Sequence, residues 1–150
     1  MKTIEKVIIA GIVGTTFMTL YSYLKAKKEN QEYVEPIMIN RLIDNSKNLP
    51  SIRDEEIHPA GWVLHYITGI GFVSVYQLLS KDALTKPTFG KTFIIGSLSG
   101  LAGILVWKML FKQHDQPPRN YRYGYYRQLF VAHIIFALAA LPTYKVLDGK

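Results

Sequence analysis

Cysteine is absent from the 150-residue sequence. Without thiols the chain forms no disulfide, offers no thiolate nucleophile and supplies no cysteine ligand to zinc or to an iron–sulfur cluster. The sequence also has no Gly-rich phosphate loop, no nucleophile elbow, no His-Glu-x-x-His stretch and no paired-carboxylate pattern. Because these catalytic signatures are missing, we expect a non-enzymatic protein.

Charge is scarce in four apolar blocks, residues 7–24, 60–80, 92–111 and 128–144, where the only Asp, Glu, Lys or Arg is Lys108. Each block is long enough to cross a bilayer as a helix. Charges concentrate outside the blocks, as a membrane requires, because a charge at mid-bilayer costs about 3 kcal/mol or more. Mean hydropathy is only +0.08, so the distribution of apolar residues, and not their total, predicts membrane spans.

These blocks predict an all-α membrane protein, a single domain over residues 1–150 built as a four-transmembrane-helix up-down bundle. Barrel strands would alternate in polarity over about ten residues. A soluble four-helix bundle would need a polar stripe on each helix, which residues 7–17 and 93–106 lack. A signal peptide is the competing interpretation of the first block, although no clear small-x-small cleavage site follows it.

The connections then fall on two faces. We define the loop face by residues 25–59 and 112–127, and the terminal face by both chain ends and residues 81–91. The loop face carries ten Lys and Arg residues. The terminal face carries seven, but it has only about half as many residues as the loop face. The number of positive charges and their density therefore favour opposite orientations in the membrane, and charge assigns neither. The net charge of +7 flanks apolar spans, so we expect contact with lipid head groups and no nucleic-acid partner.

Within the loop face, residues 35–48 predict one more helix. Pro36 suits a first-turn position, and Ile37, Met38, Leu42 and Ile43 can share one face. We expect a short amphipathic interfacial helix between spans one and two, either lying on the membrane surface or capping the bundle.

Two histidines, His65 and His133, lie inside spans two and four at similar predicted depth. Three interpretations are open. Each ring is a buried, hydrogen-bonded structural group, or the two rings line a small-ligand cavity near the loop face together with Lys108, Tyr66 and Tyr21. In the third, they are paired axial ligands of a haem, for which the sequence offers no further signature.

A second candidate site lies on the loop face, where carboxylates and imidazoles from two loops could bind a divalent metal. The candidate ligands are Glu55, Glu56, His58, His114 and Asp115. Their spacing matches no specific metal motif, and acidic loops are usually solvated.

Two short segments, residues 11–19 (GIVGTTFMT) and 61–71 (GWVLHYITGIG), resemble stretches of the YagU-like family of small bacterial multi-pass membrane proteins. The matching positions are Gly14, Thr15, Met18, Thr19, His65, Tyr66 and Gly69. The resemblance implies about four spans and residence in a bacterial cytoplasmic membrane, and it brings no established activity.

The sequence therefore favours a membrane protein with a binding, accessory or assembly role. The alternative is a redox protein that binds haem, or a proton-linked transport protein, using His65 and His133. Small residues at helix-packing spacing, such as Gly96 and Gly100, allow close helix contacts and also permit a homo-oligomer or another membrane-protein partner.

Overall fold

The computed structural model describes residues 1–149, and every regular element within them is helical. In chain order the helices are α1 (Thr3–Glu29), α2 (Glu35–Asp44), α3 (Pro59–Leu79), α4 (Lys81–Thr85), α5 (Phe89–Gln113) and α6 (Arg122–Asp148). Of these, α1, α3, α5 and α6 are long and apolar enough to cross a membrane. The prediction of an all-α chain with four such helices is confirmed.

Polar side chains cap the N-termini of α3 and α5. The His58 ring nitrogen Nδ1 accepts a hydrogen bond from the backbone N–H of Ala60 at 3.3 Å. The Thr88 hydroxyl accepts one from the backbone N–H of Lys91, also at 3.3 Å. Each cap satisfies an N–H that has no partner within its own helix.

The last helix is longer than the sequence predicts, because α6 begins at Arg122 rather than at residue 128 and continues through Pro142. Its added first turns are the aromatic-rich residues 122–127 (RYGYYR). Tyr125 packs edge-on against Trp107, with ring centroids 5.4 Å apart. This contact with α5 explains why the stretch is helical. The short helix α4 within residues 81–91 was not predicted either.

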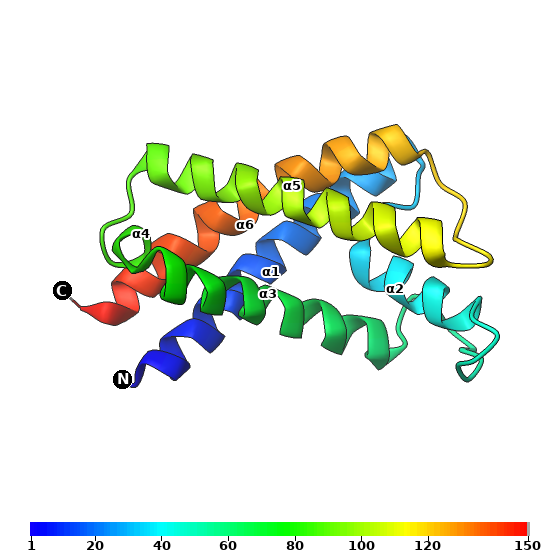
Figure 1. Ribbon diagram of the computed structural model, residues 1–150, viewed down its shortest axis with the longest axis horizontal. Coiled ribbons are helices and arrows are strands. Elements are labelled where there is room, and N and C mark those ends of the chain that lie inside the picture. The colour runs from blue at the N-terminus through cyan, green and yellow to red at the C-terminus, as the bar shows by residue number, and fades with distance from the viewer. Residues whose placement is uncertain (150) are drawn as a thin grey trace.

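Helices α1 and α6 form the central pair, with α3 packed along α1 and α5 packed along α6 (Figure 1). Small residues permit the close approaches, as predicted: a Cβ on Gly96 of α5 would lie 2.7 Å from the Cα of Ile134 in α6. Helices α3 and α5 make few contacts with each other. In Figure 1 both chain ends and α4 lie at one end of the molecule, and α2 lies at the other.

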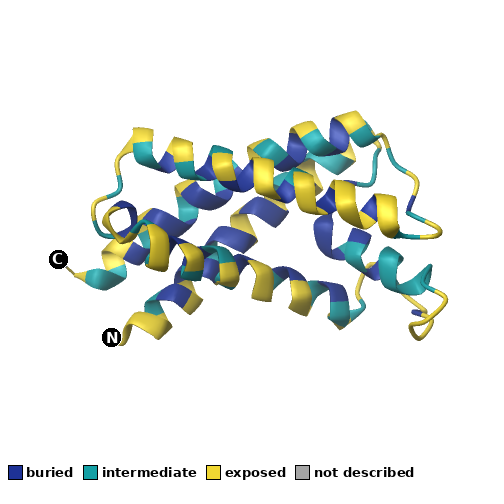
Figure 2. Cartoon of the chain, in the orientation of Figure 1, coloured by how far each residue is buried: buried dark blue, intermediate teal, exposed yellow. Residues whose placement is uncertain are grey.

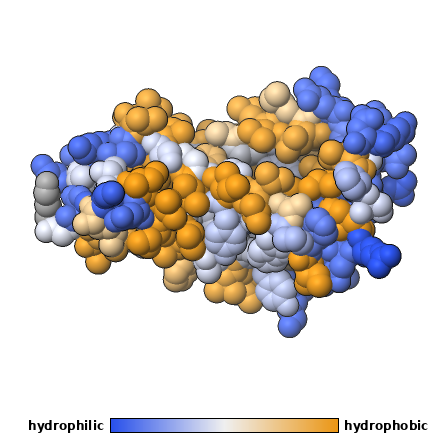
Figure 3. Space-filling model, turned by 90° about the horizontal axis from the view of Figure 1, so that it is seen from below, coloured by the Kyte–Doolittle hydropathy of each residue, from blue (hydrophilic) through white to orange (hydrophobic). Residues whose placement is uncertain are grey.

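The outward faces of α3 and α5 are apolar and exposed (Figure 2). Ile67 is 58% exposed, and Leu98 and Leu105 are each 61% exposed. Figure 3 shows apolar side chains across the middle of one face of the molecule and polar side chains at its two ends. A hydrocarbon layer would cover such a middle region favourably.

Helix α2 packs against the start of α3, and Asn40 makes the connection. Its side-chain oxygen accepts the backbone N–H of Gly61 at 2.7 Å, while its amide donates to the carbonyls of Glu55 at 2.8 Å and His58 at 2.9 Å. Asn40 and Met38 are fully buried. Helix α2 therefore packs into the bundle through one face.

Candidate functional site

A cavity of about 250 Å³ lies between α3 and α5, over the central pair α1 and α6. One helical turn beyond its lining residues Phe72 and Gly103, the hydroxyl groups of Tyr76 and Ser99 lie 2.6 Å apart. This hydrogen bond joins α3 to α5 on the side of the terminal face. At the other end, Glu35 of α2 contributes to the wall. The cavity thus has a closed end and a helix-capped end.

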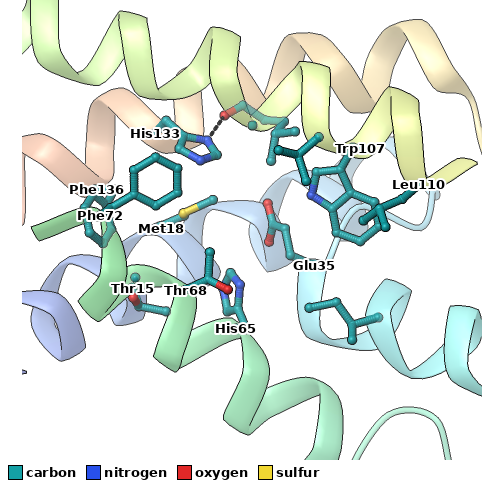
Figure 4. A pocket seen from close by; sticks show the side chains of 15 residues that line it. Thr15, Met18, Glu35, His65, Thr68, Phe72, Trp107, Leu110, His133 and Phe136 are labelled. Atoms are coloured by element: carbon teal, nitrogen blue, oxygen red, sulfur yellow. Dashed lines mark hydrogen bonds between the residues drawn. The ribbon is translucent and has the colours of Figure 1, made fainter. Parts of the chain in front are cut away.

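Most of the cavity wall is apolar. Its larger apolar residues are Met18, Phe72, Val106, Trp107, Leu129 and Phe136. Its polar residues are Thr15, Glu35, Thr68, His65 and His133 (Figure 4). Val106 is also 54% exposed on the outer surface, and Leu110, another lining residue, is 41% exposed. Because lining residues reach the outer surface of the bundle, the cavity opens sideways.

His133 is held in one orientation by its own helix. Its Nδ1 lies 2.8 Å from the Leu129 carbonyl oxygen, which can only accept, so a neutral His133 carries its proton on Nδ1. The ring packs edge-on against Phe72, with centroids 5.4 Å apart, and its other edge faces Gly103. His133 is therefore a fixed, well-packed group of the cavity wall.

His65 is held by α1. Its Nε2 lies 2.9 Å from the Thr19 hydroxyl, and that hydroxyl donates its own proton to the Thr15 carbonyl at 2.7 Å. The Thr19 oxygen must therefore accept from a protonated Nε2 of His65. The Thr15 side chain lies directly against Gly69, one turn along α3. Several residues that carry the family resemblance thus form the α1–α3 contact beside the cavity.

Glu35 is a cavity residue that the sequence analysis missed. It is 1% exposed, and its Oε1 accepts hydrogen bonds from the Ser22 hydroxyl at 2.8 Å and the Gln128 amide at 3.4 Å. Within residues 1–149 its Oε2 has no hydrogen-bond partner. Burial raises the pKa of Glu35 to about 7, and hydrogen bonds from its own backbone N–H, from Ser22 and from Gln128 offset part of that rise. The sequence did contain a signal for its burial. Glu35 lies three residues before Met38 and four before Ile39, so it falls on the apolar side of the predicted helix.

Three of the five predicted ligand contacts lie outside the cavity. Lys108 is exposed, and its ammonium group lies 5.5 Å from the centroid of the Tyr126 ring. The Tyr66 hydroxyl is 3.0 Å from the Thr16 hydroxyl, and Tyr21 packs against the hydrophobic core. Lys108 follows Trp107 directly, so the helical turn of about 100° per residue carries it away from the cavity.

The predicted metal ligands do not come together. Glu55 pairs with Arg41 at 2.7 Å, and the Nε2 of His114 lies 2.8 Å from the Leu42 carbonyl. In the described part of the chain no three His, Cys, Asp or Glu residues are grouped to hold a metal ion. The candidates concerned are Glu55, Glu56, His58, His114 and Asp115. Their loops are held by pairwise contacts with neighbouring segments.

The cavity brings His65 and His133 together, but its geometry does not suit a haem between them. Axial ligation needs a free nitrogen from each ring, facing a slot for the macrocycle. The free nitrogen of His133, Nε2, faces Gly103 instead, so closely that a Cβ there would lie 2.9 Å away. Nε2 of His65 is bonded to Thr19.

Comparisons of the chain with protein-family models, with curated proteins and with solved structures found no match. The function is therefore inferred from the cavity itself. A sideways-opening apolar space with a few fixed polar groups can hold a hydrocarbon chain or ring and orient its polar end.

Proposed function

We propose that this chain is a multi-pass membrane protein that binds an amphipathic small molecule, with the hydrocarbon part in the cavity between α3 and α5. The observation that carries the proposal is the sideways opening at Val106 and Leu110, on a surface rich in exposed apolar residues. A cavity of about 150 Å³ is enough for benzene. A volume of about 250 Å³ accommodates several methylene groups.

In this proposal the four long helices cross the membrane in alternating directions, as an up-down bundle. The support is the arrangement in Figure 1, in which successive long helices run in opposite directions between the two ends of the molecule. Helix α2 then lies at the interface on the loop face. The family resemblance favours a bacterial cytoplasmic membrane.

The polar groups of the cavity fit binding better than catalysis. His65 and His133 each use one ring nitrogen in a hydrogen bond to the protein. The Thr19 hydroxyl that His65 contacts donates its proton to the Thr15 carbonyl and not to the ring, so His65 does not act as a base that activates it. The two histidines supply fixed polar positions in an apolar wall. A binding or accessory role follows, in which the bundle presents or stores the bound molecule.

Tryptophan fluorescence tests whether a hydrocarbon chain enters the cavity. The chain contains two tryptophans, and Trp107 lines the cavity while Trp62 lies at the start of α3. In a Trp62→Phe background, Trp107 is the only tryptophan. The protein is reconstituted in vesicles of phosphatidylcholine with brominated acyl chains, which quench tryptophan on contact. Trp107 is only 8% exposed, so efficient quenching requires chains to enter the cavity.

The matched variants are Val106→Phe and Leu105→Phe, at neighbouring exposed positions of α5. Val106 lines the cavity and Leu105 does not. We expect Val106→Phe to lower the quenching at least twofold and Leu105→Phe to leave it unchanged. Equal quenching in both variants, or none in the parent protein, would refute the proposal. Both positions are more than half exposed, so both variants should fold.

A further inference from the structure

One oxygen of the Glu35 carboxyl group lacks a hydrogen-bond partner in the folded protein. Both side-chain donors, Ser22 and Gln128, bind the same oxygen, Oε1. The other oxygen, Oε2, is buried without a partner among the described residues. Figure 4 shows the carboxyl group between Met18, His65 and Trp107, in the space that the cavity residues surround.

A buried carboxylate needs a compensating cation or enough hydrogen-bond donors, because its desolvation is costly. No Lys or Arg among residues 1–149 forms an ion pair with Glu35; the nearby Arg41 pairs with Glu32 and Glu55. Buried polar atoms of native proteins are normally satisfied. An unsatisfied oxygen at the end of an apolar cavity is therefore the position where the polar end of a ligand would complete the site.

We propose that the cavity selects amphipathic molecules whose polar end is a protonated amine, which donates a hydrogen bond to Oε2 of Glu35. This inference rests on the proposed function, because it assigns the head group of the molecule bound in that cavity. An ammonium group supplies both the missing donor and the missing positive charge. A carboxylate head would instead bring two negative groups together, and an alcohol would supply the donor without the charge.

The groups that face Glu35 are compatible with this assignment. Ser22 of α1, which donates to Oε1, and Trp107 of α5, which shares the cavity wall with Glu35, carry no charge. From α3 the titratable group is His65, and from α6 they are Tyr125 and His133. With the ordinary pKa values of imidazole and phenol, about 6.5 and about 10, these groups are neutral at pH 8. Lys108 of α5 is turned toward Tyr126. The ammonium group would therefore meet Glu35 as the one charged partner.

The experiment compares three ligands with the same chain: octylamine, octanol and octanoate. Each is titrated into phosphatidylcholine proteoliposomes of the Trp62→Phe protein at pH 8, with Trp107 emission as the readout. A charge-assisted hydrogen bond predicts that octylamine binds at least about tenfold more tightly than the other two. Glu35→Gln keeps the shape of the side chain and removes its charge, so it should abolish this preference.

Glu32→Gln is the matched control, because Glu32 is a partly exposed acid on the same loop face that pairs with Arg41. It should retain the preference for octylamine. Equal affinities for the three ligands, or a preference that survives in Glu35→Gln, would overturn the assignment. If brominated chains still quench Trp107 and Val106→Phe still blocks them, the head-group assignment alone fails. If that quenching is absent, the proposed function fails with it.

Discussion

The hydroxyl groups of Tyr76 and Ser99 lie 2.6 Å apart and join α3 to α5. Elsewhere these helices make few contacts with each other, so this hydrogen bond is the main polar connection between them beside the cavity. Both residues are buried, Tyr76 at 6% and Ser99 at 5% exposed. The closed end of the cavity therefore depends on a single pair of side chains.

A double-mutant cycle with Tyr76→Phe and Ser99→Ala measures that connection. Hydrogen bonds between membrane helices average about 0.6 kcal/mol and reach about 1.7 kcal/mol. We expect a coupling free energy in this range, from unfolding titrations with SDS in mixed micelles followed by circular dichroism. Additive effects of the two substitutions would contradict the contact. Thr68→Val, which removes an exposed hydroxyl bonded within its own helix, is the control.

Gly103→Ala should destabilise the bundle by about 1–3 kcal/mol, because the added Cβ overpacks a rigid neighbour. That Cβ would lie 2.7 Å from Cε1 of His133, whose ring is fixed by the Leu129 carbonyl and by Phe72. Gly71→Ala is the matched control, since a Cβ there would meet no atom within 4 Å. The same SDS titration checks both. Equal unfolding midpoints for the two variants would show that His133 moves freely.

Asn40→Ala should release α2 from α3. The substitution removes three hydrogen bonds and leaves the buried N–H of Gly61 without an acceptor, at a cost of about 1–3 kcal/mol or more. Faster amide hydrogen exchange over Glu35–Asp44, with unchanged exchange in α1 and α6, is the expected result. Asn45→Ala, at the exposed end of α2, should leave the exchange of this helix almost unchanged. If the amide hydrogens of α2 exchange equally slowly in both variants, Asn40 does not anchor α2.

The sequence was sufficient to predict the four long helices, because a membrane imposes a strong requirement. Backbone groups in hydrocarbon must be bonded within a helix, and charges must lie outside it, so length and the absence of charge locate each span. Helix ends were less predictable. The start of α6 at Arg122 depends on contacts of Tyr125 with Trp107 and Phe111, which come from another helix.

The candidate site was predictable only in part. His65 and His133 could be identified because an ionisable side chain inside an apolar span is rare. Lys108 and Tyr66 directly follow the lining residues Trp107 and His65, but a position along a helix does not specify which way a side chain faces. Glu35 lies at the start of the amphipathic helix predicted between spans one and two, and its burial arises only when α2 packs onto the bundle through Asn40.

Glu35 should also make the stability of the ligand-free protein depend on pH. Burial raises its pKa to about 7 from 4.5, so between these values the folded protein binds more protons than the unfolded one. Its contribution is fully present below about pH 4.5 and is lost as pH rises to about 7, a decrease on the order of 3 kcal/mol. SDS titrations at pH 5 and pH 8 should show higher stability at pH 5. Glu35→Gln should reduce this difference in stability between pH 5 and pH 8, while Glu32→Gln should retain it. If the difference is unchanged in Glu35→Gln, another group causes it.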